Sequence, residues 1–266
     1  PSNLMKILKL GQMLGGSNAP SGAVAFENLY SLDFDGVDDY VTFGDSNDFS
    51  FGNGTSDTPF SVSAWIKMAD ATKFRILSKS ASGTGNIEWL FSLSGADKLA
   101  LILYDNTASN QIKRFSSVIT SDEGSWINVA ATYNGSGSNT DINLYINGVD
   151  ANDSVGSAGT YVAMHNGTAA LQMGRFVTDT GGTSYANGNI DEVSLWNKEL
   201  SSTEALNIYN SGTPTDLSSE SNLVGYWRNG DTAGTSVFPS IEDNSANSND
   251  GTMTNMDSGD IVTDVP

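Results

Sequence analysis

A strand followed directly by a short helix, within residues 187–212, restricts the fold of this chain more than any other feature. The first half is a short run of β-branched and aromatic residues after a glycine: Ile190, Val193, Leu195 and Trp196. Such a run predicts a buried strand. The second half repeats apolar residues at helical spacing: Ala205, Leu206, Ile208 and Tyr209. Ser201 and Glu204 have the spacing of a capping box, and Gly212 is suited to end the helix in a left-handed conformation.

Most of the remaining chain consists of short apolar runs separated by Gly, Asn and Ser turns. The predicted strands are Phe60–Met68, Arg75–Lys79, Glu88–Ser94, Lys98–Tyr104, Phe115–Val118, Trp126–Tyr133, Ile142–Ile146, Leu171–Gly174 and Leu223–Arg228. Asp35-Gly36 lies between two further runs and predicts a hairpin or a tight pair of strands. Asn147-Gly148 is a strong hairpin signal. Strands at this spacing favour an all-β antiparallel sandwich.

Composition limits the class of protein. The 266 residues contain no cysteine, which excludes disulfides and thiolate metal sites. Lys and Arg total 12 against 31 Asp and Glu, so the net charge is −19. This charge disfavours nucleic acid as a partner and suits hard cations such as calcium, although an acidic surface also serves solubility alone. No apolar run approaches the length of a membrane span. The length of 266 residues suits one large β-domain or two small ones, and because the sequence shows no sign of a second domain we expect one.

The first residues differ in charge from the rest. Residues 1–26 contain two lysines and no acidic residue, so this part carries +2 and the remainder −21. Its amphipathic stretch predicts an anchoring arm formed by Leu4, Lys6, Ile7, Leu8 and Lys9. The two lysines interrupt what would be the apolar part of a signal peptide, so we expect a protein that is not exported by one. We expect residues 1–28 to form this arm and residues 29–266 the sandwich, with 213–266 completing the same domain.

Five segments, in order along residues 30–212, resemble the laminin-G-like branch of the concanavalin A-like sandwiches. They are Leu32–Val41, Phe60–Ile66, Trp126–Tyr133, Asn143–Gly148 and Gly188–Trp196. The resemblance implies a jelly roll of two antiparallel sheets. Tyr226–Asp231 and Asp243–Thr252 look like the segment that usually opens such a domain, although here they close the chain. The basic arm before the sandwich is similar in arrangement to laminin-G-like proteins of tailed-phage virions.

Catalytic residues are not evident. The single histidine, His165, has no second histidine for a metal site and no Gly-x-Ser-x-Gly elbow beside it. Glycoside hydrolases on this fold need paired carboxylates, and their Glu-x-Asp-x-x-Glu pattern is absent. Asp191 and Glu192 are consecutive, so on a regular strand they point to opposite faces and do not form a pair. We therefore expect no enzyme.

A structural calcium site is implied by the resemblance. Its expected ligands are Asp35 and Asp38 in the Asp-Gly turn, with Asp191 at the entry of the later strand. A second candidate is the C-terminal loop with Asp243, Asn249 and Asp250. The alternative is that these residues only shape turns.

Glycan binding is the other function that the resemblance implies. The candidate platform combines aromatic and hydrogen-bonding residues: Trp89, Tyr104, Asn106, Arg114 and Tyr185. The alternative is that these aromatics belong to the core. We expect a non-enzymatic virion structural protein, on the virion surface, that decorates a capsid or forms a fibre. Its expected partners are the major capsid protein, further copies of itself and glycans. The alternative is a secreted or cell-surface module that binds carbohydrate with calcium.

Overall fold

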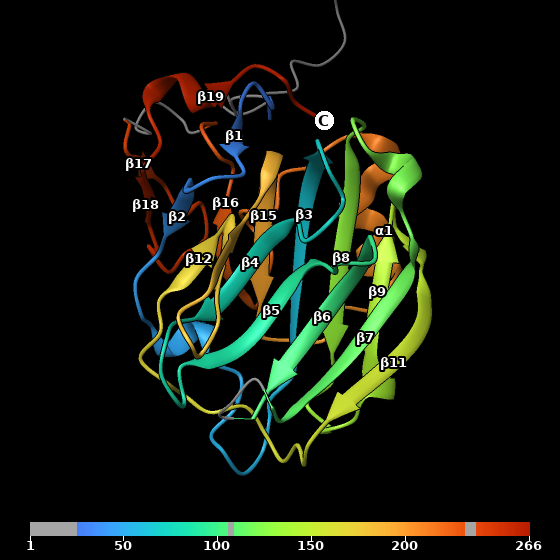
Figure 1. Ribbon diagram of the computed structural model, residues 1–266. Helices are drawn as coiled ribbons and strands as arrows, with labels where there is room; N and C mark the ends of the chain where they lie inside the picture. Colours follow the sequence, from blue (N-terminus) through green and yellow to red (C-terminus); the bar gives the residue numbers. More distant parts are fainter. Residues whose placement is uncertain (1–25, 106–108, 232–237) are drawn as a thin grey trace, which may run out of the picture.

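The computed structural model describes residues 26–105, 109–231 and 238–266, so residues 1–25 of the predicted anchoring arm and Asn106 lie outside these ranges. Two large antiparallel sheets stack as a sandwich, which confirms the predicted all-β fold (Figure 1). The first sheet contains β1 (Ser31–Asp35), β3 (Phe60–Met68), β8 (Ile127–Tyr133), β9 (Ile142–Ile146), β10 (Val149–Asp150), β15 (Asn187–Trp196), β16 (Leu223–Trp227) and β19 (Ile261–Val262). Its order is β10-β9-β8-β3-β15-β1-β19, and β16 also pairs with β15.

The second sheet has the order β11-β7-β6-β5-β4-β12-β2-β18-β17. Its strands are β2 (Tyr40–Thr42), β4 (Arg75–Ser80), β5 (Ile87–Leu93), β6 (Lys98–Tyr104), β7 (Gln111–Val118), β11 (Asn152–Ala158), β12 (Leu171–Met173), β17 (Ser240–Ile241) and β18 (Gly251–Thr254). A separate hairpin is formed by β13 (Arg175–Val177) and β14 (Thr183–Tyr185). The helices are α1 (Ser202–Tyr209) and the short 3-10 turns η1 (Asn47–Phe49), η2 (Thr120–Asp122), η3 (Asn139–Asp141), η4 (Asn210–Gly212) and η5 (Ser258–Asp260).

The core lies between the two sheets and is filled by alternate residues of the strands. On β6, for example, Leu99, Leu101 and Leu103 are fully buried in the core cluster. Successive side chains of a strand point to opposite faces, so the residues between them point outward. No helix among the described residues is long and apolar enough to cross a membrane.

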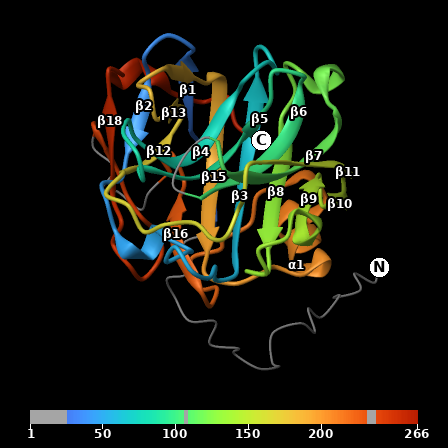
Figure 2. The same ribbon diagram turned by 60° about the horizontal axis from the view of Figure 1, so that its bottom comes forward.

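Helix α1 covers part of the outer face of the first sheet, beside β8 and β9 (Figure 2). Ser201 and Glu204 form the predicted capping box. Trp65, which points away from the core, is buried because Tyr209 of α1 packs on it with ring centroids 5.9 Å apart. The predicted stop was wrong by two residues. Asn210 ends the helix in the left-handed conformation (φ 44°), because an asparagine tolerates this region well enough to terminate the last turn.

Strand β15 pairs with three other strands of the first sheet. One of its edges pairs with β3, while the other is shared: residues 187–190 pair with β1 and residues 193–196 pair with β16. Asp191 and Glu192 lie at the break between these two partners. Glu192 has a φ of 47°, and the register with β3 shifts at the same point. The break is therefore a bulge that carries two acidic side chains.

The two Gly turns differ in what they connect. Asn147-Gly148 joins β9 to β10 in a hairpin, as predicted, with positive φ at both residues. Asp35-Gly36 does not form a hairpin, because β1 pairs with β15 and β19 in the first sheet while β2 pairs with β12 and β18 in the second. The turn instead carries the chain from one sheet to the other.

Some elements have no clear apolar signal in the sequence. Strand β11 and the β13–β14 hairpin are rich in Ser, Gly, Asn and Thr, and they form because neighbouring strands offer hydrogen bonds to them. In the C-terminal part, β16 pairs with β15, β18 with β2, and β19 with β1. The last 54 residues thus contribute strands to both sheets.

A buried lysine joins several loops to the second sheet. Lys79 is fully buried, and its Nζ lies 2.8 Å from Asp45 Oδ1 and 3.0 Å from Glu88 Oε1. It also donates to the carbonyl of Ala169 at 2.7 Å. Glu88 is fully buried as well and accepts a hydrogen bond from the N–H of Gly167 at 2.9 Å.

We expect Lys79→Met to lower the free energy of unfolding by about 3–5 kcal/mol, because it leaves a buried carboxylate without its cation. The double variant Lys79→Met/Glu88→Leu should recover much of this loss, since both charges are removed together. Urea unfolding measures both effects, with Lys73→Met at an exposed lysine as the control. An unfolding midpoint of Lys79→Met equal to that of the unaltered chain would contradict the expectation.

Candidate functional site

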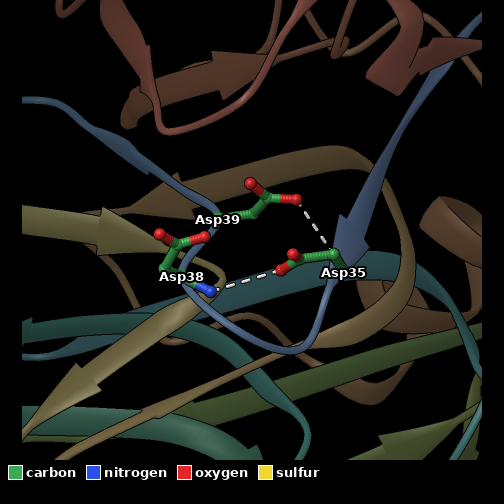
Figure 3. Close-up of side chains that lie close together, drawn as sticks. All are labelled: Asp35, Asp38 and Asp39. Atoms are coloured by element: carbon green, nitrogen blue, oxygen red, sulfur yellow. Dashed lines mark hydrogen bonds between the residues drawn. The ribbon is translucent and has the colours of Figure 1, made fainter.

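Three carboxylates converge in the turn between β1 and β2. One oxygen from each of Asp35, Asp38 and Asp39 lies within 4.8 Å of the others (Figure 3). Asp35 and Asp38 are exposed, and Asp39 is only 4% exposed. Among the described residues this is the one place where three groups of this kind come so close.

Backbone hydrogen bonds hold the turn in shape. The N–H groups of Val37 and Asp38 donate to Asp35 Oδ1 at 2.7 and 3.2 Å, and the N–H of Asp35 donates to Asp39 Oδ2 at 3.0 Å. Burial tends to raise the pKa of Asp35, but these backbone donors lower it below the ordinary value. Burial raises the pKa of Asp39 to about 6, and the nearby carboxylates of Asp35 and Asp260 add to this. The turn therefore concentrates negative charge around one poorly solvated carboxyl group.

The prediction included Asp35 and Asp38 but omitted Asp39. Asp38 and Asp39 are consecutive, and consecutive residues of an extended chain point in opposite directions. The chain is not extended here, because the Asp35 side chain folds it into a turn. The signal in the sequence was the doubled Asp next to an Asp-Gly, and only the turn geometry brings all three together.

An aromatic and cationic patch adjoins the acidic turn. We call it the Arg175 patch, formed by Tyr40, Arg175 and Tyr185. The Arg175 guanidinium carbon lies 4.5 Å from the ring centroid of Tyr40 and 5.9 Å from that of Tyr185. Tyr40 directly follows Asp39, and the turn packs on Asn187, since a Cβ at Gly36 would lie 2.9 Å from the Asn187 Cβ. The turn and the patch are thus contiguous.

Asp191 does not belong to the acidic turn. It is fully buried at the β15 bulge, where it accepts hydrogen bonds from Asn28 Nδ2 (3.0 Å) and from the N–H of Glu192 (2.7 Å). Burial raises its pKa well above the ordinary value, and the Glu192 carboxylate adds to this. The expected alternation of Asp191 and Glu192 on a regular strand does not hold here. The bulge, with its positive φ at Glu192, breaks the alternation on which that expectation rested.

Glu192 faces the other partner strand. Its carboxylate accepts hydrogen bonds from Tyr226 Oη and from Arg228 Nε, the latter at 3.2 Å. A third buried carboxylate, Asp231, accepts from the N–H groups of Leu29 and Tyr30. These three acids hold the segment before β1 and the strand β16 together at the break.

The C-terminal loop uses its predicted metal ligands internally. Asp243 accepts hydrogen bonds from the N–H groups of Tyr226, Ser245 and Asn249 at 2.8–2.9 Å. Asp250 accepts from the N–H of Asp243 at 2.9 Å, and Asn249 donates to the carbonyl of Val224 at 2.9 Å. The loop is organised by these bonds and is not brought into the acidic turn.

The predicted glycan platform is divided between several places. Trp89 is fully buried in the core, where its Nε1 donates to the Phe49 carbonyl, so it offers no platform. Tyr104 is 5% exposed and packs on Phe176. Arg114 donates to Asn152. Among the described residues of the predicted platform, Tyr185 alone lies in the Arg175 patch. The sequence does not predict this patch, because Tyr40 and Arg175 are distant in the chain.

The fold places this chain in a known class, that of the concanavalin A-like sandwiches, with two large antiparallel sheets and, among the described residues, one short α-helix. The chain belongs to the family described as Laminin_G_3, of the concanavalin A-like lectin/glucanases superfamily, whose model matches residues 35–205. A search of curated proteins gave no match.

Solved structures share this fold at low sequence identity. A candidate carbohydrate binding protein from Bacteroides ovatus is 16% identical with a TM-score of 0.53, and the match covers 86% of this chain and 59% of that one. A heptameric SAP-like pentraxin from Limulus polyphemus is 17% identical with a TM-score of 0.42, covering 65% and 82% of the two chains. The CBM40 of a Ruminococcus gnavus sialidase, solved with α2,3 sialyllactose, is 12% identical with a TM-score of 0.48, covering 67% and 96%. The chain thus spans little more than half the length of the Bacteroides protein.

In calcium-free buffer, we expect the free energy of unfolding to increase as the pH is lowered from 8 to 5. Burial raises the pKa of Glu192 to about 7, above its ordinary value of 4.5. The folded chain therefore takes up a proton in a range where the unfolded chain does not, and ionisation above pH 7 costs the folded state about 3 kcal/mol.

Urea unfolding at several pH values measures this dependence. Glu192→Gln removes one of the titrating groups and should make the dependence between pH 5 and 8 shallower, while Asp39 and Asp191 still titrate. The exposed control Glu199→Gln should leave it unchanged. A stability of the unaltered chain that decreases steadily from pH 8 to pH 5 would show that other groups dominate.

Proposed function

We propose that this chain is a non-catalytic carbohydrate-binding module that uses calcium at the acidic turn and binds glycan beside it. The observation that carries the proposal is the convergence of Asp35, Asp38 and Asp39 next to the aromatic Arg175 patch. The description of the family, which includes lectins, supports a sugar as the ligand. The Bacteroides protein is described as a candidate carbohydrate binding protein, which is consistent with this proposal, although its likeness to this chain concerns the fold alone.

The acidic turn has the chemistry that calcium prefers. Calcium takes six to eight oxygen ligands, so three carboxylates leave positions for backbone carbonyls, water or sugar hydroxyls. The pKa of Asp39, raised by burial and by the neighbouring carboxylates, supports the proposal, because a bound cation neutralises this charge as the proton does. Asp191, Asp243, Asn249 and Asp250 are assigned to structural bonds in this proposal.

The absence of catalysis is supported by the burial of the acids that interact most strongly. Asp191 is 0% and Glu192 3% exposed, so a substrate does not reach this pair. His165 is the single histidine of the chain, and its Nδ1 lies 3.5 Å from Asp105 Oδ1. A hydrolase of this fold needs two carboxyl groups that flank a bound sugar.

Calcium should bind the purified chain and raise its melting temperature, both measurable by calorimetry. We expect Asp38→Asn and Asp39→Asn each to weaken calcium binding at least tenfold, since each removes a charged ligand. Affinity should also fall below about pH 6, where Asp39 takes up a proton. Asp48→Asn, which removes the same charge at an exposed position in η1, is the control. Equal calcium affinities in all four proteins would place the cation elsewhere.

A glycan array, probed with and without a chelator, tests the second half of the proposal. Binding to a restricted set of sugars that is lost with chelator and restored by calcium is the expected outcome. A blank array in the presence of calcium would refute carbohydrate binding.

A role in a virion is the second candidate function, and the charge reversal of residues 1–26 is the observation that favours it. This part carries +2 and the remainder −21, and its apolar residues alternate with Lys6 and Lys9. We propose that the arm docks on the major capsid protein or on further copies of the chain, at a virion surface. For the carbohydrate-binding module alone, the corresponding location is extracellular.

Light scattering on the full chain and on a chain lacking residues 1–26 tests the role of the arm. We expect an oligomer, or a complex with capsid shells, that dissociates when these residues are removed. A monomer in both cases, with no affinity for shells, would leave the binding module as the remaining proposal.

A further inference from the structure

Arg175 is unusual among the four arginines of the chain. The other three, Arg75, Arg114 and Arg228, each donate hydrogen bonds to protein side chains. Within the described residues, the Arg175 guanidinium has no hydrogen bond or ion pair, and its Nε is shielded from solvent without a partner. A shielded donor of this kind calls for an explanation.

No acidic residue among the described residues forms an ion pair with Arg175. The three segments that the structure does not describe, residues 1–25, 106–108 and 232–237, contain neither Asp nor Glu. The ion pairs of the described acids involve other basic residues. One arginine is thus left without a carboxylate in a chain that has 31 of them.

The two tyrosines hold the guanidinium without using its donors. Tyr40 comes from β2 and Tyr185 from β14, and both rings contact Arg175 within 6 Å. Such contacts stabilise the cation by about 0.5–1 kcal/mol each at exposed positions. They occupy the flat face of the guanidinium, while its N–H groups point outward from the edges. Because Nε is shielded, the two terminal nitrogens are the donors that an incoming anion can reach, and they are positioned to form two parallel bonds with it.

An unpartnered acceptor lies on the same face of the second sheet. Gln172 on β12 is opposite Thr42 on β2, and Thr42 is two residues from Tyr40, so all three point outward. Gln172 is 9% exposed, and its Oε1 is buried without a hydrogen-bond partner. The face thus offers an acceptor for a hydroxyl group near a donor for an anion.

We propose that the Arg175 patch binds the carboxylate of an acidic sugar, with Arg175 donating to both carboxylate oxygens and Gln172 accepting from a neighbouring hydroxyl. The inference rests on the proposed carbohydrate binding and names the class of glycan. Bidentate pairing with a planar carboxylate is the geometry for which a guanidinium is best suited. With a net charge of −19, the chain as a whole repels anions, so binding of an acidic glycan requires a local cation.

The experiment compares glycans that differ in the carboxylate alone or nearly so. The probes are oligogalacturonate with its methyl ester, and sialyllactose with its methyl ester, titrated into the full chain with calcium and 150 mM salt. We expect at least one carboxylated probe to bind tenfold or more tightly than its neutral partner. Arg175→Met should abolish this difference, and Arg175→Lys should reduce affinity several-fold, because it keeps the charge but loses the two-point geometry.

Lys113→Met is the matched control, because it removes the same charge from another position, on β7 of the second sheet, where the cation also lies near an aromatic ring, that of Phe115 at 5.8 Å. It should bind as the unaltered chain does. If Arg175→Met does not fold, Arg175→Lys decides, and full affinity in that variant would overturn the inference.

The remaining outcomes separate the two proposals. Equal affinity for neutral and carboxylated probes, unaffected by Arg175→Met, would overturn the acidic ligand and leave carbohydrate binding in place. Binding of neutral sugars alone would have the same meaning. Failure of these probes and of the whole glycan array would overturn both.

Discussion

The division of one edge of β15 between β1 and β16 is the constraint on which the rest of this structure depends. No strand pairs with that edge at residues 191–192, and the bulge there turns two acidic side chains into the interior. Asp191 bonds to the segment before β1, and Glu192 bonds to Tyr226 and Arg228 at the end of β16. Buried charges of this kind are costly unless hydrogen bonds satisfy them, so the loss of one partner in this network would destabilise the first sheet.

The same arrangement determines where the chain crosses between the sheets. Because β1 pairs with β15 in the first sheet and β2 pairs with β18 in the second, the Asp35–Asp39 turn connects the two sheets. A crossing turn at the rim of a sandwich is open to solvent, and its carboxylates are free to converge. The β13–β14 hairpin places Arg175 over Tyr40 at the start of β2, so that the acidic and the cationic groups of the proposed site are neighbours.

The large negative charge of the chain has two distinct consequences. In the interior, each acid is matched by hydrogen bonds from the backbone, from tyrosine or from arginine, as at Asp231 and Asp243. At the rim, burial raises the pKa of Asp39, and the carboxylates of Asp35 and Asp260 add to this. In a structural acid cluster the protein's own donors compensate the negative charge. In a cation-binding site, part of that negative charge remains for the cation to compensate.

The sequence by itself determined the class of fold, because the alternation of apolar residues and the Gly and Asn turns act over a few residues. The strand at Ile142–Ile146, the hairpin at Asn147-Gly148 and the capped helix after Ser201 are all found where the local pattern predicts them. Two of the three acids of the turn were also predicted. Only the tertiary structure decided that Asp39 joins them, that Asp191 and Glu192 interact, and that Trp89 lies in the core. Each of these depends on a bulge, on a turn between sheets or on the packing of distant strands, and the Arg175 patch combines residues 40, 175 and 185 for the same reason.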